Sequence, residues 1–346
     1  MRNWIGATIL AVMLVSGSGC SALAVRLGLR VRLDTIAVTS LSASMVSRHD
    51  SSAAVGALGP GQSARLVVVA NTNAGKHYAT VGAGNGKVSF DNYTMEATTV
   101  QVSKRGTVSL PADPRLSDGK VGHLRISPTT RPDVVTVLDV PVRYDIPFVA
   151  DFSGASGSDG FNGMDGLDGL DGQDGTPAMP DPTTGALGNP GPGGNGGAGG
   201  NGWNGQDGSD GSPGENVHVW VRLEPGPKPL LQIEARSTRR DLFYLVDPSG
   251  GSLKILSNGG SGGRGGQGGR AGHGGRGGSG FPSGSSGPDG LPGSDGRPGS
   301  DGSGGVITLS VDPAAEPFLR CISWSNHGRG GSARTTTTTE PVAALW

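Results

Sequence analysis

The chain has 346 residues, enough for two or three domains, but only 34% are hydrophobic and 5% aromatic, which is thin for one packed core. Its 65 glycines account for the deficit, because most of them lie in two repeats. The net charge of −1 predicts neither a polyacidic nor a polybasic partner, and we expect no nucleic-acid binding.

Residues 1–19 have the pattern of an export signal. Arg2 supplies the positive end, and the apolar run that follows is too short to span a bilayer. Small residues in the order SGSGC then close the segment. We therefore expect the protein to leave the cytoplasm.

Two cleavage sites fit this signal. The stretch ending at Cys20 resembles a bacterial lipobox, although Gly17 stands where that motif has leucine. The resemblance implies lipidation of Cys20 and attachment to the outer membrane or cell surface, with Ser21 resembling outer-membrane sorting. The alternative is ordinary cleavage after Ala24, which would discard Cys20 and release a secreted protein.

Residues 25–150 predict an all-β domain. Short, β-branched and often alternating runs such as LRVRLDTIAV, ARLVVVA and VVTVLDVPVRYDI are separated by the turn signals GPGQS, NTNAGK and GAGNG. Strands at this spacing without a helical period favour an immunoglobulin-like β-sandwich.

Glycine recurs every third residue in two blocks, residues 151–216 and 259–305. A missing side chain at every third position predicts an extended helix with three residues per turn, packed where only a hydrogen atom fits. The first block is interrupted by TPAMPDPTT, which predicts a turn between two antiparallel arms. The second block breaks at Phe281 and Pro282.

Strands are expected around the second block, in residues 217–258 before it and in a β-hairpin over 306–332 after it. A Thr-rich tail over 333–346 ends the chain. The segment VWVRLEPGPKPLLQIEARS aligns without gaps on ITLSVDPAAEPFLRCISWS, 88 residues later, and the preceding glycines align at the same offset. A glycine arm that feeds a small β-sheet is therefore present twice.

Three structures could produce the glycine period. Collagen is a parallel trimer, which suits neither arms that turn back nor the doublets in GGSGGRGGQGG. A flexible linker would not keep the phase. We therefore expect a single-chain polyglycine-II bundle, a monomer, with a trimer as the alternative if the arms are collagen-like. In the bundle, the doublet Gly268 and Gly269 marks the most enclosed helix.

The arms resemble the polyglycine-II bundles of some antifreeze proteins and phage adhesin tips. The layout from residue 150 onward, including the ending EPVAALW, is similar to glycine-rich, collagen-like bacterial surface lipoproteins. Because that family has mostly no assigned activity, the resemblance implies placement at the surface and little chemistry.

Charged residues recur along the arms with the same period as glycine, which makes them a candidate ionic ladder: Asp165, Asp168, Asp171 and Asp174 on one arm, and Arg264, Arg270 and Arg276 on another. Aspartates three residues apart lie about 9 Å from one another, too far for one ladder to chelate calcium alone. Solvated carboxylates, pairing with the arginines and anion binding by the arginines all remain open.

Catalytic patterns are not found in the sequence. The histidines lack metal-ligand spacing, no serine belongs to a recognisable triad, and Cys321 aligns with Ile233, which favours a small buried residue. We expect no enzyme activity, no metal and no cofactor. The expected function is a structural or adhesive surface lipoprotein, which could contact other surface proteins or glycans. The alternative is a binding module for glycans, ions or ice along the arms.

Overall fold

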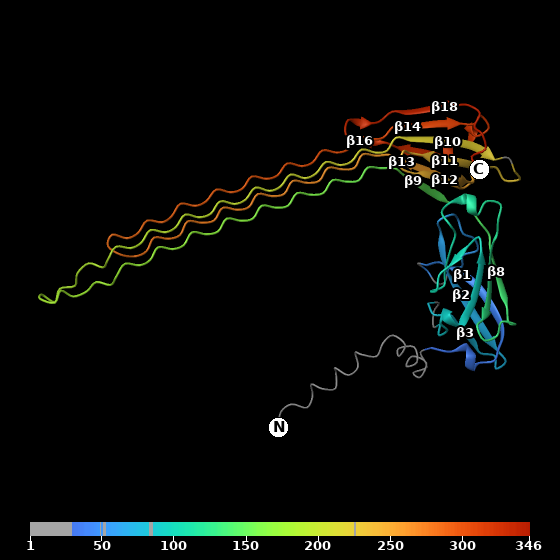
Figure 1. Cartoon of the computed structure of the whole chain (residues 1–346), viewed down its shortest axis with the longest axis horizontal. Helices are drawn as coiled ribbons and strands as arrows, with labels where there is room; N and C mark the ends of the chain where they lie inside the picture. Colours follow the sequence, from blue (N-terminus) through green and yellow to red (C-terminus); the bar gives the residue numbers. More distant parts are fainter. Residues whose placement is uncertain (1–29, 49, 51–52, 83–85, 225) are drawn as a thin grey trace, which may run out of the picture.

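The computed structural model describes residues 30–346 except 49, 51–52, 83–85 and 225, and the predicted export signal and Cys20 lie outside these residues. The described chain is all-β, and its only helices are short 3-10 turns. It forms three parts: an N-terminal unit, a second β unit that we call the platform, and a long rod that leaves the platform (Figure 1).

The N-terminal unit contains two sheets around one core. In the first, β1 and β2 pair antiparallel, and β2 also pairs with β3 and β6. The first sheet comprises β1 (Val38–Val46), β2 (Ser63–Thr72), β3 (His77–Ala79), β5 (Gln101–Val102) and β6 (Thr107–Ser109). The second comprises β4 (Tyr93–Thr98), β7 (Gly122–Pro128) and β8 (Thr136–Val140). The 3-10 turns of this unit are η1 (Leu33–Thr35), η2 (Phe90–Asn92) and η3 (Pro114–Leu116).

Alternation along the strands builds this core. In β7, Leu124 and Ile126 are fully buried, whereas His123 and Arg125, each of which precedes one of them, are exposed. The domain predicted over residues 25–150 is too long at its carboxyl end, because the strand that begins in its last residues belongs to the platform. This strand, β9 (Pro147–Asp151), pairs with β13, and its buried Phe148 and Ala150 lie in the platform core.

The platform consists of two further sheets that share one core. The larger contains, in spatial order, β12 (Asp241–Val246), β11 (Leu230–Arg236), β10 (Val217–Glu224), β14 (Ile307–Val311) and β18 (Thr335–Thr339). The smaller contains β15 (Ile322–Ser325), β13 (Ser252–Leu256) and β9. A short hairpin, β16 (His327–Gly328) and β17 (Gly331–Ser332), adjoins them.

One expectation for the carboxyl end is wrong. The predicted hairpin over 306–332 does not form, because β14 pairs parallel with β10 while β15 pairs parallel with β13 in the other sheet. The turn η4 (Glu316–Cys321) carries the chain from one sheet to the other. The Thr-rich tail contains a strand, since β18 pairs parallel with β14 at the edge of the larger sheet.

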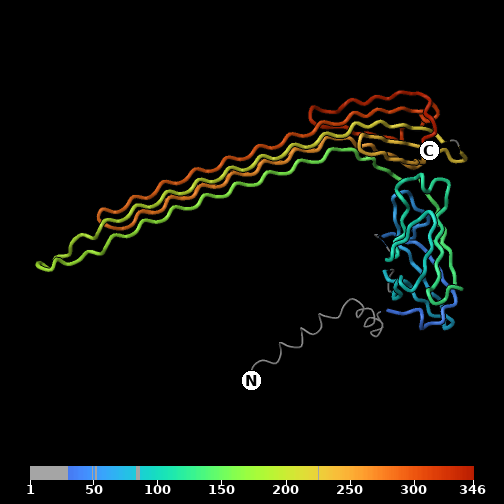
Figure 2. Tube along the Cα trace, viewed as in Figure 1, coloured from blue at the N-terminus to red at the C-terminus, as the bar shows by residue number. Residues whose placement is uncertain are grey.

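The rod is made of four extended glycine-rich segments from one chain, which run side by side (Figure 2). We name them segment A (residues 154–175), segment B (191–214), segment C (259–280) and segment D (284–305). A and C run parallel to each other, as do B and D, since their bonded residue pairs keep a constant difference in number. The loop between A and B lies at the far end of the rod (Figure 1).

Candidate functional site

Backbone hydrogen bonds join the rod segments along their whole length. Glycine amides of A donate to carbonyls of C from Gly154–Asn258 at the root to Gly175–Ser279 near the tip, at 2.7–2.8 Å. Segment C donates to B, as in Gly269 to Trp203 at 2.8 Å, and D donates to C, as in Gly293 to Gly269 at 2.8 Å. Segment B donates to both A and D. B and C therefore each bond to all three other segments, and A and D form the outer edges.

Segment C shows why two glycines per triplet are needed. With three residues per turn, its side chains form three rows. A Cβ on Gly268 would lie 2.1 Å from the carbonyl oxygen of Gly293 in D, and one on Gly269 would lie 1.9 Å from that of Met164 in A. The third row, which includes Gln267 and Arg270, is exposed. The structure thus places the two singled-out glycines against two different backbones.

The aspartates of segment A bond to the backbone of segment C. Asp165 Oδ1 accepts from the amide of Arg270 at 2.7 Å, and Asn162 Oδ1 accepts from the amide of Gln267 at 2.8 Å. The same bond recurs at a residue difference of 105 for six triplets, with acceptors Asp159, Asn162, Asp165, Asp168, Asp171 and Asp174. The carboxylates therefore serve as acceptors for amides that the glycine ladder leaves unpaired.

Two further ladders of this kind bind the other segments. Residues of B such as Asn204 and Asp207 accept from amides of D at a constant difference of 90, at 2.9 and 2.6 Å. Asp289, Asp295 and Asp301 of D accept from glycine amides of C at 2.7–2.8 Å. Since both asparagine and aspartate occur within one ladder, what these positions share is an acceptor oxygen and not a charge.

The platform strands set the register of the rod. In the smaller sheet β9 pairs with β13 so that Pro147 faces Ser252, a difference of 105. In the larger sheet Val217 of β10 faces Ile307 of β14, a difference of 90. The aspartate and asparagine ladders keep these same two differences, 105 between A and C and 90 between B and D. Each segment is thus the continuation of a strand, and the sheet pairing passes into the rod without a shift.

The predicted ionic ladder is therefore bonded differently from a row of ion pairs. The two rows do lie on adjacent segments, but Asp165, Asp168 and Asp171 bond to the backbone amides of Arg270, His273 and Arg276. Within the described residues, no ion pair joins the predicted aspartates to Arg264, Arg270 or Arg276, whose side chains are exposed. At the tip end, Asp174 also accepts from the Ser279 hydroxyl at 2.6 Å, which holds the pKa of that carboxyl below its usual value.

Replacing Asp165, Asp168 and Asp171 together by asparagine should leave the melting temperature close to that of the wild type, because each amide keeps its acceptor. Replacement by alanine should lower it, since three hydrogen bonds worth on the order of 1 kcal/mol each are lost. Thermal melting at low and high salt measures both triple variants, and the loss should persist at high salt. An asparagine variant as unstable as the alanine variant would show that charge is what matters.

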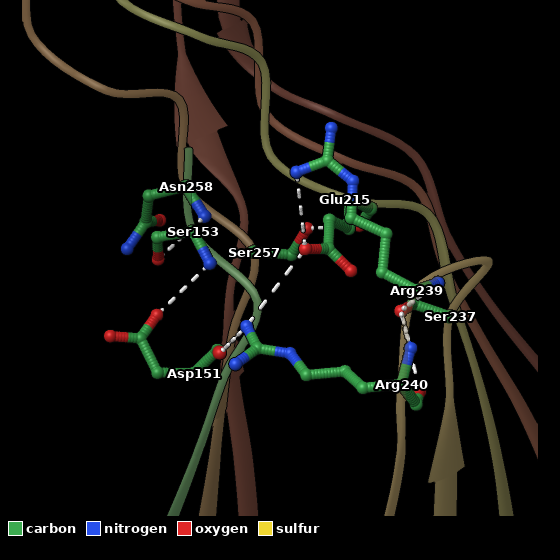
Figure 3. Close-up of polar contacts among 8 residues, drawn as sticks. All are labelled: Asp151, Ser153, Glu215, Ser237, Arg239, Arg240, Ser257 and Asn258. Carbon is green, nitrogen blue, oxygen red and sulfur yellow. Dashed lines mark hydrogen bonds and ion pairs between the residues drawn. The ribbon is translucent and has the colours of Figure 1, made fainter. Parts of the chain in front are cut away.

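A polar cluster fastens the rod to the platform (Figure 3). The Ser257 hydroxyl donates to the Glu215 carbonyl at 2.5 Å, and the Asn258 amide donates to the Ser153 hydroxyl at 3.2 Å. The Ser153 amide donates to Asp151 Oδ1 at 2.9 Å, and this bond is the main cause that lowers the pKa of Asp151. These bonds tie the last strand residues to the first residues of the rod.

Two arginines of the β11–β12 connection complete this root cluster. Arg239 and Arg240 lie 3.8 and 3.9 Å from Glu215 Oε1, and Arg240 also donates to the Asp151 carbonyl. The Arg240 guanidinium lies 4.9 Å above the ring of Phe152. The Glu215 side chain is only 14% exposed, and the two guanidiniums face its Oε1, whereas its buried Oε2 has no hydrogen-bond partner among the described residues.

The carboxyl-terminal tryptophan connects the platform to the N-terminal unit. Trp346 Nε1 donates to Asp118 Oδ2 at 3.1 Å, and its ring meets Phe243 edge-on at 6.0 Å. Arg115 of η3 lies 3.5 Å above the same Phe243 ring. Beside this contact, a groove of about 570 Å³ between the two units is lined by residues including Lys120, Tyr144, Glu224 and Lys228. Through these contacts the platform packs against the N-terminal unit.

Cys321, Trp203 and Phe281 take no part in the acceptor ladders. Cys321 is half-buried and free, and burial raises the pKa of its thiol. Trp203 and Phe281 are exposed at 66% and 63%. In the described ranges, no three His, Cys, Asp or Glu side chains are grouped to hold a metal ion. Over the same residues there is no helix with the length and apolarity to cross a membrane.

Comparison of the chain with known protein families, with curated proteins and with solved structures finds no match.

Proposed function

We propose that this protein is a structural or adhesive surface protein whose platform holds out a stiff polyglycine-II-type rod. The supporting observation is the continuous set of inter-segment hydrogen bonds, which runs from Gly154 near the platform to Gly175 near the tip. At about 3.1 Å per residue, the 22 residues of such an arm extend about 70 Å. A rod held by backbone bonds is stiff without a hydrophobic core, so most of its side chains are free to meet other molecules.

The arrangement of the chain suits an anchor at the amino terminus. The described chain starts at the end of the N-terminal unit that lies away from the platform (Figure 1). A lipid on Cys20, in the outer membrane or at the cell surface, would therefore leave the N-terminal unit as a spacer and the rod farther out. The two packed sheets of that unit suit an immunoglobulin-like spacer of this kind. All four segments return to the platform, so the tip carries only the loop over 176–190.

Display at the surface can be tested with a cysteine at the tip. Ala186→Cys, made in a Cys321→Ser background, lies in a loop whose residues 181–190 are all exposed. A membrane-impermeant maleimide should label it on intact cells as strongly as in lysates. With Cys20→Ala added, the labelled protein should move to the medium. Labelling that requires lysis would rule out a surface role, and protein that stays cell-bound without Cys20 would rule out the lipid anchor.

A further inference from the structure

The rod has two different faces. On one, the exposed row of segment C, with Arg264, Arg270 and Arg276, runs beside aspartate rows of A and D. Contacts between side chains place these rows together, since Ser261 Oγ bonds Ser156 Oγ at 3.1 Å and His273 Nδ1 lies 3.8 Å from Asp289. This face is charged along its length.

The opposite face carries an apolar strip that is uncharged except at its Phe161 end, where Gln206 of B bonds to Phe161 and Asp207 and Arg297 follow. Segment A presents a row of large apolar side chains that are 68–84% exposed: Phe161, Met164, Leu167 and Leu170. Trp203 of B, 66% exposed, adjoins this row, because its amide donates to the Met164 carbonyl at 2.8 Å. Leu291 of D lies on the other side of segment B and is 69% exposed. The neighbouring side chains are uncharged over most of the strip. This holds for B from Asn195 to Asn204, and for the row of D that contains Leu291, from Ser285 to Ser294.

A row without side chains runs beside the leucines. A Cβ on Gly197 would lie 3.2 Å from the amide nitrogen of Leu170, and one on Gly200 would lie 3.0 Å from that of Leu167. Farther toward the root, the same two rows hold Ser158 and Ser209, whose hydroxyls are 3.0 Å apart. The strip therefore consists of a row of leucines next to a row of empty slots with the same repeat of about 9 Å.

We propose that this strip is the contact between two copies of the chain, whose rods pair side by side and parallel. A two-fold axis along the rods sets the leucine row of each copy over the glycine row of the other, so that one surface complements itself. The exposed parts of the six large side chains offer on the order of 900 Å², which matches the ~800 Å² that each partner gives to a standard interface. A strip that is uncharged over most of its length also costs little to desolvate. The pairing rests on the rod being stiff, as proposed above.

Two double variants test the pairing by sedimentation equilibrium of residues 25–346, which retain every described residue. Leu167→Gln with Leu170→Gln removes the two leucine side chains that would enter the slots of the partner. Gln173 of the same row shows that glutamine fits there. Gly197→Gln with Gly200→Gln fills the slots, as Gln206 does in its row. Each should raise the dimer dissociation constant at least about a hundredfold, because one buried leucine is worth about a factor of ten or more.

The matched control is Met179→Gln with Leu187→Gln, which removes two equally exposed apolar side chains from the tip loop and should leave the dimer intact. Spin labels on Ala186→Cys, with Cys321→Ser, report direction. Parallel copies bring the labels to the same end, whereas antiparallel copies would separate them by on the order of 90 Å at about 3.1 Å per residue.

The outcomes separate the pairing from the function proposed above. A wild type that stays monomeric, a dimer that survives filling of the slots, or labels at opposite ends would each overturn the parallel pairing. The strip would then be free for another occupant such as a neutral glycan. Solution scattering on the same samples shows whether the rod is stiff. An extended monomer that does not pair counts against the pairing alone, whereas a compact or coiled monomer counts against the stiff rod as well.

Discussion

A variant that lacks Ser261 should be unable to form the rod. Deletion of this one residue shifts the rest of segment C back by one position. Arg264, Gln267, Arg270, His273 and Arg276 then fall in the row that faces segment A, where a Cβ would lie 1.9–2.0 Å from a backbone oxygen. No rotamer relieves a clash at Cβ, so the segment has to separate from its neighbours. Solution scattering of residues 25–346 should show the loss of the extended shape.

The control for this deletion removes more residues, but it removes them as whole triplets and so keeps the phase. It deletes one whole triplet from each segment at matched positions: 172–174, 194–196, 276–278 and 284–286. All rows keep their partners, because both residue differences fall by the same six residues along the whole rod, and the rod should shorten by about 9 Å and keep its melting temperature. If this variant and the Ser261 deletion behaved alike, the rod would not depend on phase.

Gly269→Ala should destabilise the protein strongly, because the methyl would enter the most enclosed row of segment C. Every residue of the row facing A, from Gly260 to Gly278, is a buried glycine. The methyl would lie 1.9 Å from the Met164 oxygen and strain the bonds from Gly269 to Trp203 and from Gly293 to Gly269. Overpacking of this kind costs roughly 1–3 kcal/mol, a fall of about 2–10 °C in melting temperature for a unit of this size.

Two neighbours serve as controls for this substitution. Gln267→Ala changes an exposed position and should be neutral. Gly268→Ala should cost less than Gly269→Ala, because its row faces the outer segment D and already carries one alanine, Ala271. If the block were disordered, Gly→Ala would be neutral or slightly stabilising. Three identical melting curves would therefore exclude a packed rod.

The sequence predicted the all-β class and the rows of glycine, because glycine phase is a local property that reports how closely backbones approach. Pairing between distant strands is not local, which explains the wrong hairpin over 306–332. The alignment at offset 88 identified β10 and β14 as equivalent strands, but they pair in parallel at a difference of 90.

The ladder of acceptors was missed for a similar reason. Equal spacing of Asp165 and Arg270 predicted a contact between side chains, whereas the carboxylate bonds to the backbone of the arginine. The signal was present in Asn162 and Asn204, which occupy the same rows as aspartates and carry no charge. A position that accepts either residue requires an acceptor oxygen, and that inference was available from the sequence alone.

The order in which the chain can fold follows from the pairing of segment A with segment C. Each glycine amide of A pairs with a carbonyl 104 residues later, and β10 pairs with β14, 90 residues later. Contacts of such high order form slowly, because the entropy of closing a long loop is lost before any bond repays it. The N-terminal unit can fold as soon as residue 142 is made, but the rod cannot be completed until the last strands have emerged. Segments A and B must therefore stay hydrated and uncollapsed meanwhile, and the glycine at every third position, which offers no side chain to a wrong partner, suits that wait.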